Sequence, residues 1–172
     1  MRNVFVILLL LVSIHAIGQT PEEKLSQLGI ELPKLPDPIA SYVHVVRTGN
    51  LLFLSGKGPQ QSSGEYIKGK LGKDLSTQQG YEAAKLVGIL QLAAIKGAVG
   101  DLSRVRRIVK VNGYVNSEPN YYDHPKVING LSDLMIAVFG EKGKHARTSL
   151  GVAALPLNMA VEIELVVEVD ED

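Results

Sequence analysis

The most constraining feature of the sequence is the segment 161–169, VEIELVVEV, in which apolar residues alternate with mostly acidic ones. A period of two residues predicts a β-strand, because successive side chains of a strand point to opposite faces of its sheet. One face of this strand should meet a hydrophobic core and the other a polar environment. The chain therefore has to build a sheet, and another part of the chain has to cover one side of it.

Two segments carry the helical period that could supply this cover. Ser76 and Gln79 have the S-x-x-Q spacing of a capping box, and apolar residues follow them at helical spacing. The second helix should begin near Pro125 and end at Gly140, since proline suits the first turn of a helix and glycine suits its end.

Further runs rich in β-branched residues predict the remaining strands. The first two form a hairpin around Gly49 and Asn50, residues that accept positive φ. A short strand is also expected around 66–67. The four longer runs are 43–46, 51–54, 105–115 and 147–153.

The order of the predicted elements is strand-strand, helix, strand, helix, strand-strand. Two helices cannot cover both faces of such a sheet, so we predict an α+β fold with a mostly antiparallel sheet and both main helices on one face. The other face retains apolar residues. We expect neighbouring copies of the chain to bury that face, which predicts an oligomer.

The first forty residues divide into two parts. Residues 1–18 combine Arg2, an apolar run over 4–14, and small residues at 16 and 18, the pattern of a signal peptide. This predicts an exported protein, periplasmic or secreted, with no membrane segment after cleavage; an uncleaved N-terminal anchor is the alternative. Residues 19–40 are predicted to form a lead-in, with a short helix capped by Thr20 and a proline-rich connector. The domain proper then covers 41–172.

Several kinds of chemistry are disfavoured. The chain has no cysteine, which removes disulfides, thiolate catalysis and cysteine metal sites. Its formal net charge is zero, and it lacks both a phosphate-binding glycine loop and a G-x-S-x-G elbow. The histidines lack metal-ligand spacing, so neither a metal nor a cofactor is expected. A basic cluster over 104–110 is interpreted as a solvated strand edge and not as a nucleic-acid site.

Arg147 and Glu162 are the most informative polar residues, because each begins one of the last two predicted strands. Antiparallel neighbours would bring the two side by side. A guanidinium can hold a substrate carboxylate with two parallel hydrogen bonds, and a carboxylate can orient or deprotonate water. From the residues alone an exposed ion pair across a sheet is the simpler interpretation. Glu164 lies on the same strand face as Glu162 and competes with it for the role.

Four stretches of the chain resemble the RidA/YjgF family, also known as reactive-intermediate deaminases. They resemble the family's P-Y-x…G-N opening, its hydrophobic-S-G strand end, its P-A-R-S-C segment and its L-P…I-E-I-E close. The stretches are Ser41-Tyr42-Val43 with Gly49-Asn50, Leu51 to Gly56, Ala146 to Ser149, and Leu155-Pro156 with Val161 to Glu164. Shorter segments, such as GIELP and HPKVING, resemble a RidA-like subgroup.

The resemblance implies a chorismate-mutase-like subunit that forms a homotrimeric barrel with ligand clefts between neighbouring subunits. It implies that Arg147 binds the carboxylate of a 2-imino acid and that Glu162 positions water. The reaction would be hydrolysis of the imine to a 2-keto acid and ammonia. The substrate-binding positions that it implies are Tyr42, Ser55, Gly56, Asn129 and Ser149.

Three positions depart from the family pattern. His145 stands where the family has proline, Ser149 replaces the cysteine, and Lys57 replaces the glutamine after S-G. The loss of cysteine removes any reactive thiol but leaves water and backbone groups for imine hydrolysis. The alternatives at this stage are a trimer that binds small carboxylates without catalysis, an endoribonuclease-like translation inhibitor, and a protein with a holdase-like surface. The predicted export and the neutral net charge disfavour the endoribonuclease.

Overall fold

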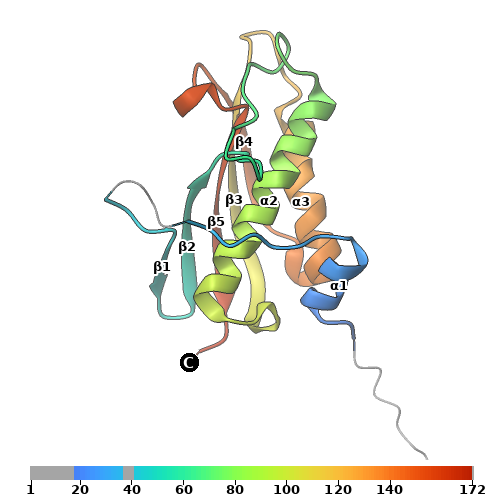
Figure 1. Cartoon of the computed structure of the whole chain (residues 1–172), viewed down its shortest axis with the longest axis vertical. Helices are drawn as coiled ribbons and strands as arrows, with labels where there is room; N and C mark the ends of the chain where they lie inside the picture. Colours follow the sequence, from blue (N-terminus) through green and yellow to red (C-terminus); the bar gives the residue numbers. More distant parts are fainter. Residues whose placement is uncertain (1–17, 37–40, 172) are drawn as a thin grey trace, which may run out of the picture.

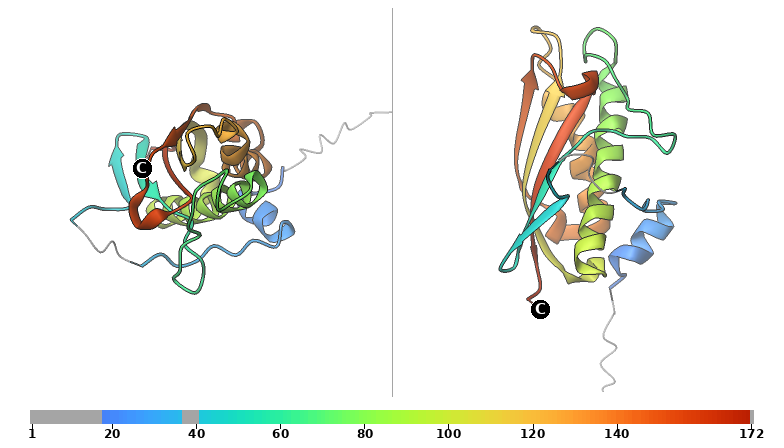
Figure 2. Two further views of the ribbon diagram at one scale, coloured as in Figure 1. Left: turned by 90° about the horizontal axis from the view of Figure 1, so that it is seen from above. Right: turned by 60° about the vertical axis from the view of Figure 1, so that its left-hand side comes forward.

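The computed structural model describes residues 18–36 and 41–171. They form two layers, a five-stranded sheet and a pair of long helices that cover one of its faces (Figure 1). Figure 2 shows the layers edge-on, with the sheet on one side and the helices on the other. This is the predicted α+β arrangement. Residues 1–17, which hold most of the predicted signal peptide, and 37–40 of the connector lie outside the described residues.

The sheet has the order β1-β2-β5-β3-β4. All neighbouring strands are antiparallel except β3 and β4, which are parallel. The strands are β1 (Val45–Thr48), β2 (Leu51–Lys57), β3 (Val105–Asn116), β4 (Ala146–Val152) and β5 (Val161–Val169).

The helices begin and end where the sequence predicted. The short α1 (Pro21–Gln27) has Thr20 as the N-cap of a capping box, and α2 (Thr77–Val99) has Ser76 in the same role. The third helix, α3 (His124–Phe139), has proline in its first turn and Gly140 as its C-cap. Three single turns of 3-10 helix complete the described elements: η1 (Leu102–Arg104), η2 (Gly140–Gly143) and η3 (Pro156–Asn158).

β5 forms the centre of the sheet and follows the predicted alternation. Its five apolar odd-numbered residues are at most 2% exposed and pack under the helices, while its even-numbered residues face the other way. That second face, which we call the open face, also carries Val46, Phe53 and Leu150. These three side chains are 46–52% exposed, so the open face keeps an apolar component in a single chain.

The two long helices touch through their backbones at Gly130 of α3. A Cβ at this position would lie 2.0 Å from the carbonyl oxygen of Tyr81 and 2.9 Å from the nitrogen of Lys85, both in α2. Only glycine permits this approach. On the same helix α2, buried Gln91 donates from Nε2 to the carbonyl oxygens of Ser55 and Ile163, which ties α2 to strands β2 and β5.

Two predictions about the strands were wrong. β4 and β5 were expected to be antiparallel neighbours, but β3 lies between them and pairs with both. The reason is that α3 forms a crossover that returns β4 parallel to β3, on the far side of β3 from β5. The short strand expected around 66–67 is only an isolated bridge between Gln60 and Tyr66. Among the described residues, the helices are too short or too polar to cross a bilayer.

Candidate functional site

Arg147 lies on β4, the edge strand, with its side chain on the helix-covered side of the sheet. Its Nη1 donates to Oδ1 of Asn129 at 2.8 Å and to Oγ of Ser132 at 3.0 Å, both on α3. Both acceptors are neutral, and no carboxylate of the described residues lies within ion-pair distance of the guanidinium. The positive charge of Arg147 is therefore held in place without being neutralised.

A chain of hydrogen bonds continues from Ser132 to His145. The His145 Nδ1 is 2.7 Å from the carbonyl oxygen of Gly143, which can only accept, so Nδ1 carries the proton of the neutral ring. The Nε2 atom then accepts from the Ser132 hydroxyl at 3.0 Å, and that hydroxyl accepts from Arg147. Burial lowers the pKa of His145, an effect to which the Arg147 charge adds and which the Gly143 bond opposes. Because the neutral ring accepts a hydrogen bond from the Ser132 hydroxyl, the hydroxyl oxygen presents a lone pair to Arg147.

Ser149 lies two residues after Arg147 on the same face of β4. Its Oγ is buried and has no hydrogen-bond partner among the described residues. The Nε and Nη2 groups of Arg147 likewise have no protein acceptor within that part of the chain. A buried hydroxyl without a partner costs about 1–3 kcal/mol, so an additional polar group beside Arg147 would be stabilised there.

Glu162 borders a different hollow, at the end of β2. The strand pairing of β2 with β5 is irregular between Leu54 and Lys57, and a cavity of about 310 Å³ opens beside this bulge. The carboxylate lies over Gly56, where a Cβ would be 2.3 Å from Oε1, so glycine is needed to admit it. Other residues that line the cavity include Pro36, Tyr42, His44, Lys57, Tyr66 and Met159.

The two glutamates of β5 differ in what surrounds them. Glu164 Oε1 accepts from Asn112 Nδ2 at 2.9 Å and from the Tyr114 hydroxyl at 3.4 Å. Glu162 has no such partner among the described residues, and burial, with a smaller contribution from the Glu164 charge, raises its pKa. Glu162 is therefore the carboxyl group that is available to exchange a proton with a molecule in the cavity.

Two of the expected substrate-binding residues lie at or next to this cavity, one in the segment before β1 and one on β2. Tyr42 lines it and is 53% exposed. Ser55 is held by both ends, because its hydroxyl donates to the Val43 carbonyl at 2.7 Å and its own carbonyl accepts from Gln91. Ser55 thus fixes the backbone that leads into the cavity, and its hydroxyl is already occupied.

The seven candidate residues consequently fall into two groups. Arg147, Asn129 and Ser149 lie together at the β4 edge on the helix side. Tyr42, Ser55, Gly56 and Glu162 lie together at the cavity. The prediction that Arg147 and Glu162 lie side by side is wrong for a single chain, because β3 separates their strands and the two side chains project from opposite faces of the sheet.

Sequence reasoning did not assign a role to Ser132 or to His44, and it noted Lys57 and His145 only as departures from a pattern. Ser132 is one helical turn from Asn129, a spacing that places both on one face of α3. That spacing was the available signal. The contact of Lys57 with His44 joins residues on two different segments and had no signal in the sequence.

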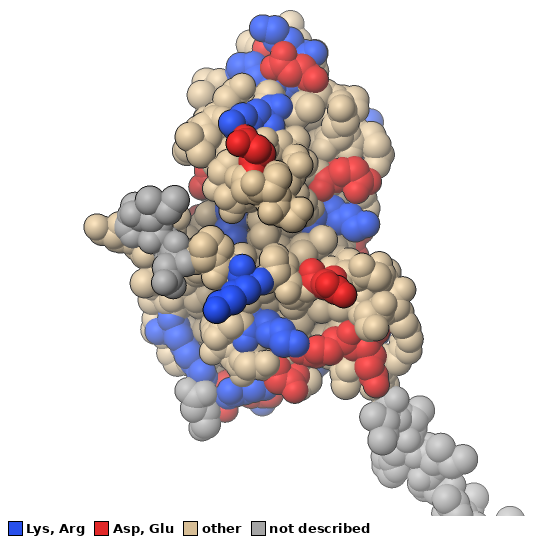
Figure 3. All heavy atoms as spheres, viewed as in Figure 1, with Lys and Arg blue, Asp and Glu red and all other residues tan. Residues whose placement is uncertain are grey.

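The basic cluster at 104–110 does not form a one-sided patch. Arg106 pairs with Asp170 at 2.8 Å, and Lys110 donates to the Thr148 hydroxyl at 3.2 Å. Arg104 donates to the carbonyl oxygens of Val99 and Glu171. On the helix-covered side of the molecule, acidic and basic side chains are interspersed (Figure 3). Within the described ranges, no three His, Asp or Glu side chains are grouped to hold a metal ion.

Comparison with known proteins places this geometry in a family. The model of the family described as "YjgF/chorismate_mutase-like, putative endoribonuclease" matches residues 22–169. The chain is 42% identical to Protein TCP17 of Trypanosoma cruzi over 85% of its own length and 92% of that protein. It is 30% identical to a 2-iminobutanoate/2-iminopropanoate deaminase of Dermatophagoides farinae, over 82% of this chain and 95% of that one.

A solved structure shows the same fold. A Shewanella oneidensis protein described as a "putative endoribonuclease" superposes with a TM-score of 0.84 at 34% identity, covering 88% of this chain and all of that one. The chorismate-mutase-like fold expected from the sequence resemblance is therefore confirmed.

Proposed function

Because the chain belongs to the YjgF/chorismate mutase-like family, in which a 30% identical relative is a 2-iminobutanoate/2-iminopropanoate deaminase, we propose that it hydrolyses small 2-imino acids to 2-keto acids and ammonia. The observation that carries the proposal is the Arg147 guanidinium, which two neutral oxygens hold while its remaining N–H groups lack a protein acceptor among the described residues. A 2-imino acid brings the carboxylate that such a group binds.

The two groups of residues have complementary tasks in this reaction. Arg147 binds the substrate carboxylate and so orients the imine carbon, and Ser149 offers a hydroxyl beside it. Burial raises the pKa of Glu162, which holds a water molecule near the imine carbon. As this water attacks the carbon, Glu162 accepts a proton from the water and then passes the proton to the departing nitrogen. The carbinolamine that forms collapses to the keto acid and ammonia.

The two groups have to meet between copies of the chain. Arg147 lies on an edge strand, while Glu162 lies at a cavity on another part of the sheet, so one copy cannot bring both to one substrate. The half-exposed Val46, Phe53 and Leu150 supply an apolar reason for the open faces to associate. A homotrimer with three clefts, each using Arg147 of one copy and Glu162 of the next, satisfies both requirements.

The test is the rate of ammonia release from 2-iminobutanoate generated in solution by an amino-acid oxidase. Wild-type protein should accelerate release, Arg147→Ala should abolish the acceleration, and Glu162→Gln should lower it by about 100-fold. Arg106→Gln is the matched control, because Arg106 is an exposed arginine paired with Asp170 and should leave the rate unchanged. Sedimentation of the same samples measures the oligomeric state.

Two other experimental outcomes would support a carboxylate-binding protein or an endoribonuclease instead. Binding of 2-ketobutyrate that depends on Arg147 but without faster ammonia release would identify a non-catalytic carboxylate-binding protein. RNA cleavage with strongly salt-dependent RNA binding would identify the endoribonuclease activity named in the family description.

A further inference from the structure

Lys57 ends β2 and points its amine at a neutral nitrogen. Its Nζ is 2.9 Å from Nδ1 of His44, and the Nε2 atom of the same ring is 2.8 Å from the carbonyl oxygen of Pro36. Since a carbonyl oxygen only accepts, Nε2 carries the ring proton and Nδ1 accepts a hydrogen bond from the lysine. The segment before β1 thus holds the amine in a defined direction through His44.

The surroundings of Lys57 favour the uncharged amine. The side chain lines the same cavity of about 310 Å³ as Glu162, together with apolar groups of Leu90, Leu157 and Met159. No carboxylate among the described residues forms an ion pair with it, and its hydrogen-bond acceptor is neutral. Burial accordingly lowers the pKa of the lysine from 10.5 to about 8.

We propose that Lys57 is a nucleophilic amine that forms a covalent imine with the carbonyl or imine carbon of a small 2-oxo or 2-imino acid held in this cavity. The inference rests on the proposed deaminase function and adds to it a covalent route. The residue that stands here in place of glutamine supplies the nucleophile, in a chain that has no cysteine. Desolvated lysines are the usual source of such imines.

The covalent step is balanced in atoms and protons. The Nζ lone pair attacks the C2 atom of the 2-imino acid and forms a new C–N bond, which gives a diamine. Two protons pass in turn from Nζ to the original nitrogen, the original C–N bond breaks, and ammonia leaves, so that a neutral lysyl imine remains. Water then adds to the lysyl imine, and collapse of the carbinolamine releases the 2-keto acid and regenerates the free amine. Glu162, which borders the same cavity, is placed to carry these protons.

The lowered pKa gives the size of the advantage. At neutral pH the fraction of free amine at a pKa of about 8 exceeds that of an ordinary lysine at 10.5 by about 300-fold. The ionisable groups that face Lys57 across the cavity are Tyr42, His44, Tyr66 and Glu162. Adduct formation by Lys57 should therefore rise with pH and level off above about 8, whereas surface lysines continue to gain reactivity to higher pH.

The test is reductive trapping of the full-length protein with 2-ketobutyrate and cyanoborohydride at pH 7, followed by intact mass and tryptic mapping. One adduct per chain should form rapidly, and it should block cleavage after Lys57, so that a single peptide covering 48–68 replaces two. Lys57→Gln and Lys57→Arg should both abolish this adduct. The arginine variant retains a cation and a donor to His44 but is not a nucleophile.

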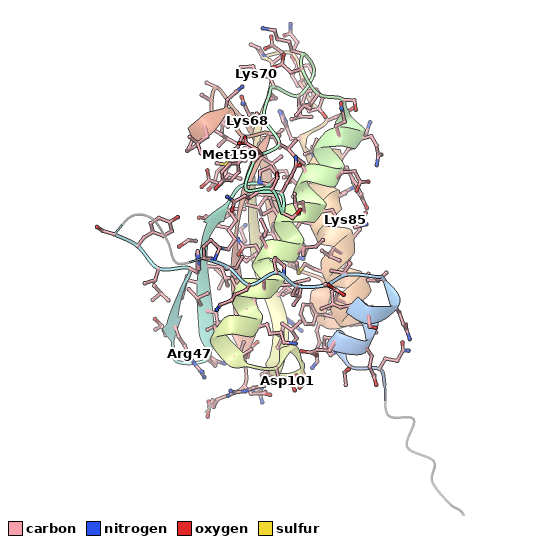
Figure 4. The ribbon with its side chains drawn as sticks, viewed as in Figure 1. Arg47, Lys68, Lys70, Lys85, Asp101 and Met159 are labelled. Carbon is pink, nitrogen blue, oxygen red and sulfur yellow. The ribbon has the colours of Figure 1, made fainter. Side chains whose placement is uncertain are left out.

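Lys68→Gln is the matched control. Lys68 is an exposed lysine paired with Glu65 at 3.5 Å, and it forms a backbone bridge with Met159 at the rim of the cavity (Figure 4). This variant should keep the adduct in full. Slow labelling spread over many lysines, or an adduct of equal yield in Lys57→Arg, overturns the proposal.

Ammonia release and the Lys57 adduct report on different steps, so each can fail without the other. Rapid ammonia release that Lys57→Arg leaves unchanged would preserve the deaminase function and overturn the covalent route. A specific Lys57 adduct without accelerated ammonia release would support the reactive amine and overturn the deaminase function.

Discussion

The β4 edge and the β2 cavity differ in whether their ionisable side chains keep their charge. At the edge, Arg147 remains a cation held by the neutral oxygens of Asn129 and Ser132. In the cavity, burial raises the pKa of Glu162 and lowers that of Lys57, so that both the acid and the base move toward their uncharged forms. One region is therefore suited to bind an anion, and the other to move protons.

The cause of the difference is the side-chain chemistry available in each region. A guanidinium stays protonated in proteins, so its burial has to be compensated by hydrogen bonds. A carboxyl group and an amine can instead give up their charge when they are desolvated. The proposed imine hydrolysis would use both properties, a fixed cation for the substrate carboxylate and groups that can gain and lose protons.

The largest expected effect is a loss of carboxylate binding on substitution of Arg147, which would distinguish binding from proton transfer. Arg147→Ala should weaken 2-ketobutyrate binding by about 100-fold, because a charge-assisted pair of hydrogen bonds is lost. Calorimetric titration measures this, and Glu162→Gln should bind within about twofold of wild type. Equal losses in both variants would mean that the two regions do not divide the tasks in this way.

A second substitution should disturb the cavity alone. Gly56→Ala places a methyl group 2.3 Å from Glu162 Oε1, so the carboxylate has to move. We expect the ammonia-release rate to fall by about tenfold, with unchanged carboxylate affinity. Gly97→Ala is the control, since a Cβ at Gly97 meets nothing within 4 Å.

The pH dependence of stability provides a third test. Between pH 8 and 10.5 the unfolded chain binds the Lys57 proton more tightly than the folded chain does, so the free energy of unfolding should rise with pH across this window. After allowance for solvent screening, the contribution is on the order of 1 kcal/mol. Urea titrations of wild type and Lys57→Gln at pH 7.5 and 10 measure it, and the variant should show a smaller rise.

The contribution of Glu162 to the free energy of unfolding should change with pH in the opposite direction. Its folded pKa is raised, so the folded chain binds its proton more tightly, and stability should fall as pH rises through the window above 4.5. Glu162→Gln should remove this fall. A variant that follows the wild-type curve between pH 4.5 and 7 would contradict the assigned burial effect.

The smallest effect concerns the bonds behind Arg147. Ser132→Ala removes one of the two acceptors of the guanidinium and should weaken 2-ketobutyrate binding by about fivefold, equivalent to about 1 kcal/mol. His145→Gln should do the same to a smaller extent, because an amide can still accept from Ser132. Ser26→Ala on α1 is the control for loss of a serine hydroxyl, and its affinity should equal that of wild type.

The sequence allowed the elements to be predicted well, because their signals are local. The alternation of β5 and the capping box at Ser76 each depend on neighbours in the chain, and the structure has both. The order of strands was harder, since a period of two says which face a side chain occupies but not which strand lies beside it. For that reason β3 was missed as the strand between β4 and β5.

The same distinction between local and long-range information applies to the candidate site. The family pattern indicated Arg147 and Glu162, but their separation follows from strand order and could not be read from spacing. The altered protonation of Lys57 depends on a segment far along the backbone that covers it, through His44 and Pro36. Such burial is a property of the assembled fold and cannot be predicted from the identity of a single residue.

The glycine contact between the long helices links these distant regions through the backbone. Asn129 and Ser132 lie within two residues of Gly130, whose backbone rests on that of α2, and Gln91 further along α2 donates to the carbonyl oxygen of Ser55 next to the cavity. The β4 edge and the cavity are thus connected through the packed backbones of α3 and α2. Substitutions that alter ligand preference are therefore expected among the side chains that line the two regions and not at Gly130, where a Cβ would push α3 away from α2.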